Sequence, residues 1–197
     1  MHNIALFPLN LVLFPGTILP LRIFETRYVD LVSECLREDT GFGICAIREG
    51  SEVGGGAICY ETGTYGKIID WTQLDDGLLG ITVEAQKRFQ VQAFSERRNK
   101  LLEGEIIWLE DDAVPTDESF ALLQALLQRI LEHYEIEVAE LNDKLSDAAW
   151  LSYRLAEYLP LDSKVKQGLL ETHESVARLT ELERLLGDNK MLEIPEQ

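Results

Sequence analysis

The feature that most constrains the fold of this chain is an apolar run near the N-terminus, residues 4–21, which Pro8, Pro15 and Pro20 interrupt. A proline inside a helix costs about 3 kcal/mol, so the run predicts extended segments broken by turns and not a membrane-spanning helix. The first three residues carry no Lys or Arg, and no small-residue cleavage pattern follows, so a secretory signal is excluded. We therefore expect a cytoplasmic protein that does not bind membranes.

Within this run, residues 14–17 (FPGT) match a type II turn. Proline fixes φ at the second position of such a turn, and Gly16 permits the positive φ of the third. We expect the turn to join two strands. Pro8 and Pro20 should limit pairing at the ends of these strands, because proline donates no hydrogen bond to a ladder.

Residues 3–112 alternate short apolar segments with turns, and one segment, containing Tyr28, Leu31 and Cys35, has helical spacing. Strands are predicted over 17–24, 43–47, 58–71 with a possible break near 63–66, 78–85 and 102–109. Residues 81–93 alternate apolar with polar side chains, which predicts a hairpin with one buried face. Many short strands with one helix are typical of a small β-barrel or a strongly bent sheet.

Beyond about residue 116, apolar residues recur three and four apart, which predicts helices. These span about 120–134, 151–159, 162–170 and 176–186, the last ended by Gly187. The acidic stretch 110–118 contains Pro115 and offers Thr116 or Asp117 as N-cap, which indicates a connection between two subdomains. We thus expect an α+β protein with a β subdomain over 1–113, a helical subdomain over 114–188 and a mobile tail over 189–197.

Composition limits the possible ligands. The net charge of −17 repels phosphate groups over much of the surface, so nucleic acid is an unfavourable partner. Cys35, Cys45 and Cys59 are odd in number and form no CxxC pair, which predicts buried thiols in a reducing compartment. The three histidines lie far apart in the sequence, and there is no HExxH motif, so we expect no metal site.

No catalytic motif is complete. Gly66-Lys67 does not form a phosphate loop, because Glu61 stands where the first glycine is required and Ile68 replaces Ser/Thr. The serines lack a G-x-S-x-G elbow, so no nucleophile for acyl transfer is visible. We expect neither an enzyme nor a bound cofactor.

A basic cluster suggests one alternative function. Its members are Lys87, Arg88, Arg97, Arg98 and Lys100. They could contact the phosphates of an RNA, or they could cover apolar edges and protect a strand from aggregation, which is the commoner role of such residues.

Three blocks of the sequence resemble one known family. The first covers residues 6–28 (LFPLNLVLFPGTILPLRIFETRY), with Thr26 where the family pattern has proline. The second comprises 61–68 (ETGTYGKI) and 80–89, and the third comprises 159–161 (LPL), 166–171 (KQGLLE) and 178–179. In this order the blocks resemble a free-standing Lon N-terminal domain, the substrate-recognition part of the ATP-dependent Lon protease.

The resemblance implies a PUA-like β-barrel with one short helix, followed by a C-terminal α-helical bundle. It implies binding of polypeptide segments or a partner protein. Because the chain stops at Gln197, we expect no ATPase or Ser-Lys peptidase domain. Candidate contact residues are Phe24, Arg27, Tyr28 and Tyr65, whose alternative role is ordinary packing.

Two other functions stay open at this point. PUA-like folds also host RNA readers, so the basic cluster could bind RNA. The chain could also be a hydrolase whose motif is not visible. The sequence predicts no oligomeric state.

Overall fold

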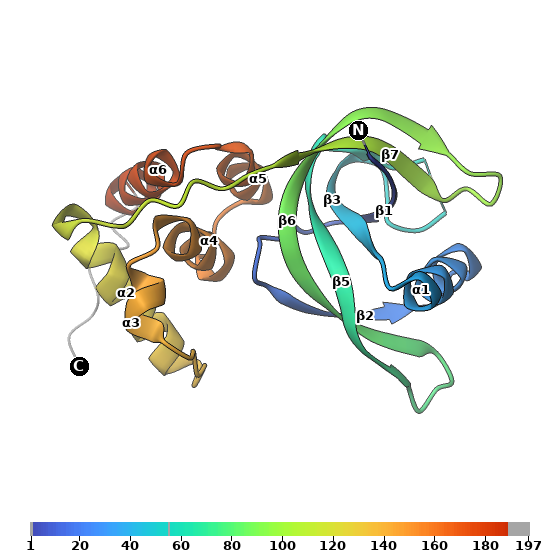
Figure 1. The fold of residues 1–197 in the computed structure, drawn as a ribbon, viewed down its shortest axis with the longest axis horizontal. Coiled ribbons are helices and arrows are strands. Elements are labelled where there is room, and N and C mark those ends of the chain that lie inside the picture. The colour runs from blue at the N-terminus through green and yellow to red at the C-terminus, as the bar shows by residue number, and fades with distance from the viewer. Residues whose placement is uncertain (1, 55, 189–197) are drawn as a thin grey trace. The chain divides into compact units, whose positions relative to one another are not determined.

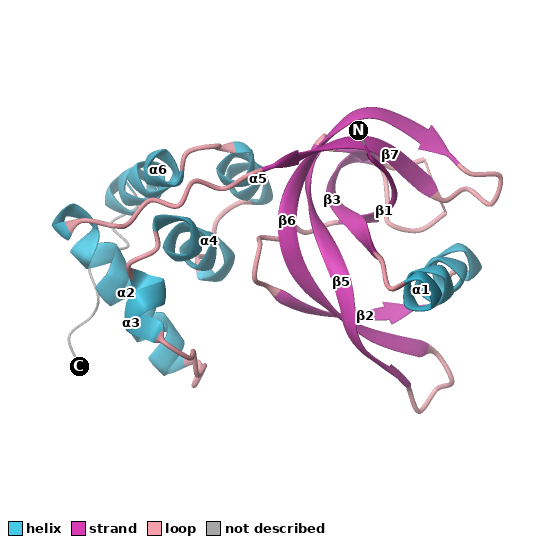
Figure 2. Ribbon diagram, in the orientation of Figure 1, coloured by secondary structure: helices cyan, strands magenta, loops and turns pink. Residues whose placement is uncertain are grey.

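The structure is a computed structural model that describes residues 2–54 and 56–188. The predicted mobile tail, 189–197, lies outside the described residues. The chain divides into two compact units, Met1–Glu110 and Asp111–Gln197, and each is described by itself. Figure 1 gives the labels of the elements and Figure 2 separates helices from strands.

The first unit combines a mixed sheet with one helix (Figures 1 and 2). Its elements are β1 (His2–Leu9), β2 (Ile18–Ile23), α1 (Thr26–Glu38), β3 (Gly41–Glu49), β4 (Ile58–Cys59), β5 (Thr62–Gln73), β6 (Leu79–Glu96) and β7 (Leu102–Leu109). The strand order is β1-β7-β6-β5-β3-β4, with β2 paired to β6. Because β1 also pairs with β3, in parallel, the path of pairings returns to the strand on which it started.

The turn predicted at residues 14–17 is present. Gly16 has φ +83°, and the Thr17 N–H donates to the Phe14 carbonyl at 3.2 Å. The turn is also fixed to β6, because the Gly16 N–H donates to the Ala85 carbonyl at 2.7 Å. It leads into β2, but residues 10–13 before it belong to no strand, so it does not form a tight hairpin between β1 and β2.

The prediction that Pro8 and Pro20 limit strand pairing is wrong. Pro8 lies within β1 opposite Cys45, and Pro20 lies within β2 opposite Thr82. Among the described residues β2 pairs only with β6, so one of its edges needs no hydrogen-bond donor. A proline is tolerated on such an edge.

The predicted hairpin over 81–93 is also wrong, because β6 is one strand of 18 residues. Thr64 pairs with Arg88 and Gly66 pairs with Ala85, so β6 has one residue more than β5 across this interval. This extra residue is a β-bulge at Gln86-Lys87. In the sequence, the three polar residues 86–88 between Ala85 and Phe89 look like a turn between two strands.

The strand break predicted near residues 63–66 is absent, since β5 runs through it. The core of the unit consists of two apolar clusters. In the larger one, Tyr28, Leu31 and Val32 of α1 pack against residues of β1, β3 and β6. The smaller one surrounds Phe89. All three cysteines are buried and unpaired, as predicted.

The second unit is helical (Figure 2). It contains the 3-10 helix Glu118–Phe120, α2 (Ala121–His133), α3 (Leu141–Leu145), α4 (Ala148–Tyr158), α5 (Ser163–Glu171) and α6 (Ser175–Asp188). Eight of the eleven residues of α4 are buried, and α4 contacts each of the other α-helices of the unit. Asp147 caps α4 by accepting from the N–H groups of Ala149 and Trp150. None of the described helices has the length and apolar character that a membrane span needs.

The last helix ends two residues later than the predicted end at residue 186. Gly187 does not adopt a positive φ, which is the conformation with which glycine commonly ends a helix, so α6 continues to Asp188.

Candidate functional site

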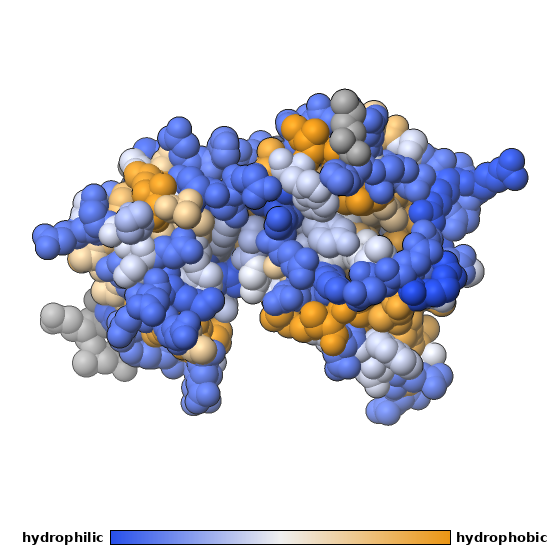
Figure 3. Space-filling view, viewed as in Figure 1, coloured by the Kyte–Doolittle hydropathy of each residue, from blue (hydrophilic) through white to orange (hydrophobic). Residues whose placement is uncertain are grey.

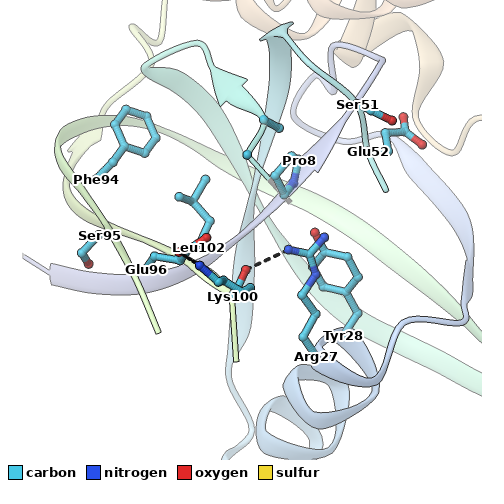
Figure 4. Close-up of a pocket in the computed structure, with 12 residues that line it drawn as sticks. Pro8, Arg27, Tyr28, Ser51, Glu52, Phe94, Ser95, Glu96, Lys100 and Leu102 are labelled. Atoms are coloured by element: carbon cyan, nitrogen blue, oxygen red, sulfur yellow. Dashed lines mark hydrogen bonds and ion pairs between the residues drawn. The ribbon is translucent and has the colours of Figure 1, made fainter. Parts of the chain in front are cut away.

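A cavity of about 310 Å³ in the first unit is the candidate site (Figure 4). Pro8 of β1 and Arg27 and Tyr28, from the first turn of α1, form part of its wall. The end of β6 contributes Phe94, and Leu102 comes from the start of β7. The loop between β3 and β4 completes the cavity, so the site brings together segments that are far apart in the sequence.

Tyr28 forms an ordered part of the wall. Its side chain is only 5% exposed, and its ring stacks on Phe7 with 4.0 Å between centroids. The guanidinium carbon of Arg27 lies 4.6 Å from the centroid of the Tyr28 ring. Figure 4 shows both side chains reaching from α1 toward Pro8. One aromatic ring, of Tyr28, and one cationic group, of Arg27, are therefore held together at the cavity.

Arg27 connects the wall to the turn between β6 and β7. Its Nη1 donates to the Lys100 carbonyl at 2.8 Å, and its Nη2 lies 3.0 Å from Glu25 Oε2. Lys100 has φ +69°, which is uncommon for a residue with a side chain. The hydrogen bond from Arg27 helps to hold this conformation, so the side chain that lines the cavity also shapes it.

The charges around the cavity balance. Arg27 and Lys100 face the carboxylates Glu52 and Glu96, and Lys100 Nζ lies 3.1 Å from Glu96 Oε2. The Glu52 carboxylate accepts a hydrogen bond from the Asn10 N–H. Because the positive and negative charges are equal in number, the apolar walls decide which ligand the cavity suits. Such a cavity suits an uncharged, apolar side chain whose neighbours can hydrogen-bond at the rim.

The described residues that line the cavity include no histidine and no cysteine. Within the described part of the chain, no group of three or more His, Cys, Asp or Glu residues could hold a metal ion. The lining residues offer apolar, hydroxyl, carboxylate, ammonium and guanidinium groups.

Burial raises the pKa of Tyr28 from 10.0 to about 12, against a smaller opposing effect of Arg27. The unfolded chain loses the tyrosine proton near pH 10, while the folded protein keeps it until about pH 12. We therefore expect the free energy of unfolding to fall by about 2 kcal/mol more in the wild type than in Tyr28→Phe as pH rises from about 10 to 12. Urea unfolding at a series of pH values measures this, and identical pH slopes would contradict it.

The other two candidate residues lie elsewhere in the first unit. Phe24 is 58% exposed, in the segment between β2 and α1, and does not line the cavity. Tyr65 is half-buried in β5, where its hydroxyl accepts a hydrogen bond from the Gly41 N–H and its ring meets Trp108 edge-on at 5.4 Å. The structure thus brings Arg27 and Tyr28 together and uses Tyr65 in packing.

Sequence reasoning missed Pro8, Phe94 and Leu102 as cavity residues. Phe94 left a signal, since it is the single aromatic residue in the polar stretch 92–100 and is 42% exposed. Pro8 and Leu102 left none, because the pairing of β1 with β3 places Pro8 and the pairing of β1 with β7 places Leu102.

The basic cluster of the sequence does not lie together on one free surface. Arg88 is fully buried. Arg97 donates to both carboxylate oxygens of Glu34, at 2.6 and 3.1 Å, and to Glu103 at 2.7 Å. Protein groups therefore already occupy the strongest phosphate-binding side chains of the cluster.

Known proteins resemble this chain over nearly its whole length. Residues 3–188 match the family model described as the ATP-dependent protease La (LON) substrate-binding domain. The crystal structure of a Lon N-terminal domain protein from Xanthomonas campestris is 34% identical, with a TM-score of 0.80, over 93% of this chain and 98% of that chain. The N-terminal domain of the Mycobacterium avium complex Lon protease has the same fold, with a TM-score of 0.70 at 22% identity over 95% of this chain and 99% of that chain.

This chain matches only a part of the sequence of a complete Lon protease. The Lon protease of Cytophaga hutchinsonii is 27% identical over 94% of this chain but only 24% of its own length. The chain thus spans about a quarter of that relative, and the match covers the substrate-binding domain and not a peptidase domain. The chain belongs to the family of LON substrate-binding domains of ATP-dependent protease La.

Proposed function

We propose that this chain is a non-catalytic module that binds polypeptide segments or a partner protein, and that the cavity beside Arg27 and Tyr28 receives an apolar side chain of the bound segment. The observation that carries the proposal is the family match over residues 3–188, since the substrate of a protease is a polypeptide. The cavity supports it, because its mainly apolar wall, in which two cations and two carboxylates balance, suits a side chain of an unfolded segment better than it suits a phosphate or a metal ion.

We further propose that the first unit is a PUA-like barrel and the second a helical bundle. The return of the strand pairings to β1 supports a PUA-like barrel, and the packing of α4 against its neighbours supports a helical bundle. The buried, unpaired thiols of Cys35, Cys45 and Cys59 support a reducing location such as the cytoplasm.

RNA binding has less support as an alternative. Its phosphate contacts would have to include Arg88, which is buried, and Arg97, which two carboxylates already hold. Binding of RNA that weakened steeply as salt was raised would nevertheless favour it.

Removal of the Phe94 ring tests the cavity. We expect Phe94→Ala to weaken binding of a labelled, uncharged peptide rich in Leu and Phe by about tenfold, because the variant loses the apolar contact of one aromatic side chain. Fluorescence anisotropy with the full chain measures the affinity. Ile107→Ala, on the similarly exposed Ile107 of β7, is the matched control and should bind as the wild type does.

Two results would contradict the proposal. Equal affinities of Phe94→Ala and wild type would remove the cavity from the binding site. Hydrolysis of ATP or of a peptide by the pure protein, at a rate that follows the protein through purification, would show that the module is an enzyme.

A further inference from the structure

A second hollow in the first unit, of about 640 Å³, lies where β2, β6 and β5 run side by side next to the turn of the β5–β6 hairpin. The three strands are in register here. Leu21 pairs with Ile81 and Ile81 with Trp71, while Arg22 pairs with Gly80 and Gly80 with Thr72. No residue of this hollow lines the cavity beside Arg27, so it is a separate feature of the surface.

The hollow has an exposed aromatic side. Trp71 is 59% exposed, although tryptophan buries more apolar area than other residues when it packs. The Leu74 side chain lies close to Gly80, where an added Cβ would be 3.0 Å from Leu74 Cδ2. In Figure 3 orange, apolar surface lies around β2, and the tip of the β5–β6 hairpin below it is blue. Apolar and hydrophilic groups therefore meet at this place.

The rim of the hollow is acidic. Asp70, Asp75 and Asp76 line it, and Arg22 is the only cation among its lining residues. Arg22 forms an ion pair with Asp76, and no cation in the described part of the chain is paired with Asp70 or Asp75. Two negative charges thus remain uncompensated beside an exposed indole ring. Carboxylates and the face of an indole both attract ammonium and guanidinium groups.

We propose that this hollow docks an extended polypeptide segment that carries Lys or Arg next to apolar side chains. The apolar side chains would lie against Trp71, and the cations would meet Asp70 and Asp75. Pro20, within β2, cannot donate to an added strand, so recognition rests on side chains rather than on extension of the sheet. The chain's own net charge of −17 makes a second copy, or a nucleic acid, a poor occupant of an acidic hollow.

The inference concerns a different surface from the cavity and does not depend on whether the cavity binds. Its test uses three labelled peptides that share one apolar sequence with Trp and Leu and differ only in having Lys and Arg, Gln, or Glu at the intervening positions. We expect the full chain to bind the basic peptide at least about tenfold more tightly than the acidic one at low salt, with the neutral peptide between them.

Variants test whether the preference for the basic peptide arises at the hollow. Trp71→Ala should weaken binding of the basic peptide by about tenfold or more, as expected for an aromatic anchor. Asp70→Asn combined with Asp75→Asn should weaken it by about threefold and reduce its dependence on salt. The control is Asp30→Asn with Glu183→Gln, which removes the same charge from exposed positions outside the hollow and should leave binding nearly unchanged.

Three results of the binding assay with these peptides and with Trp71→Ala would overturn the inference. These are equal affinities for the basic and acidic peptides, unchanged binding by a folded Trp71→Ala protein, and absence of binding to any of the three peptides. Sedimentation that shows a dimer in the wild type and a monomer in Trp71→Ala would assign the hollow to a second copy instead. Loss of binding in Phe94→Ala alone would leave the cavity as the site and refute the hollow, so the two proposals can fail separately.

Discussion

Replacement of Gly63 by alanine is expected to destabilise the first unit by about 3 kcal/mol. Gly63 lies in β5 opposite Phe89 of β6, and an added Cβ would lie 2.5 Å from the Ile44 carbonyl oxygen and 2.7 Å from the Phe89 ring. The oxygen belongs to the backbone of β3, and the ring is fully buried, so neither can move without displacing a strand. Urea unfolding followed by tryptophan fluorescence measures the loss.

Gly168→Ala is the matched control for this prediction. Gly168 lies in α5, where an added Cβ meets no atom within 4 Å, so alanine should stabilise the helix by up to about 1 kcal/mol. The same chemical change is thus expected to have opposite signs at the two positions. A wild-type unfolding midpoint for Gly63→Ala would show that β3 and β5 can move apart at little cost.

Replacement of Arg178 by methionine is expected to destabilise the second unit by about 3 kcal/mol. Arg178 is fully buried in α6. Its Nε donates to Ser152 Oγ at 2.8 Å and its Nη1 to the Thr172 carbonyl at 2.7 Å, while the guanidinium lies 4.0 Å from the centroid of the Tyr153 ring. Methionine keeps the apolar stem but leaves the buried acceptors without these donors.

The loss of helical circular dichroism on heating or in urea measures this effect, because α1 is the one α-helix described in the first unit. Arg184→Met serves as the control. Arg184 lies on the exposed face of the same helix, where it pairs with Glu181, and surface pairs of this kind contribute less than about 1 kcal/mol. Similar losses in both variants would mean that the buried hydrogen bonds of Arg178 contribute little.

Features that depend on neighbouring residues, such as turns and helices, could largely be predicted from the sequence. The turn at residues 14–17 follows from the conformational limits of proline and glycine, and the structure has it. Four of the helices in the second unit were predicted from apolar spacing, but the start of α4 was missed because Ala148 and Ala149 add little to that spacing. The family could also be identified from the sequence, because three separate blocks occur in one order.

Features that depend on how strands pair could not be predicted from the sequence. The bulge at Gln86-Lys87 is local, but the sequence cannot distinguish it from a turn, because the two differ in whether β6 keeps its partners on both sides. Gly63 and Gly66 look like a break in a strand, whereas the structure uses them where other strands approach closely.

The candidate site was predicted in part. Arg27 and Tyr28 were found because they lie in a recognisable block, and they do line the cavity. Phe24 came from the same block, and Tyr65 was chosen for its place in a glycine-rich segment expected to turn. Both lie outside the cavity, since exposure and register decide where each points. Arg88 illustrates the same limit, because its charge suggested a surface residue and its place in β6 buries it.

The sequence by itself determined the turn chemistry, most helices, the unpaired cysteines and the family, because each depends on neighbouring residues or on a pattern along the chain. Only the tertiary structure decided that β6 is continuous, that a cavity forms beside Tyr28 and that an acidic hollow surrounds Trp71. These features arise where β1, β2, β5, β6 and β7 pair, and the free energy that fixes such pairings is distributed over residues far apart in the chain.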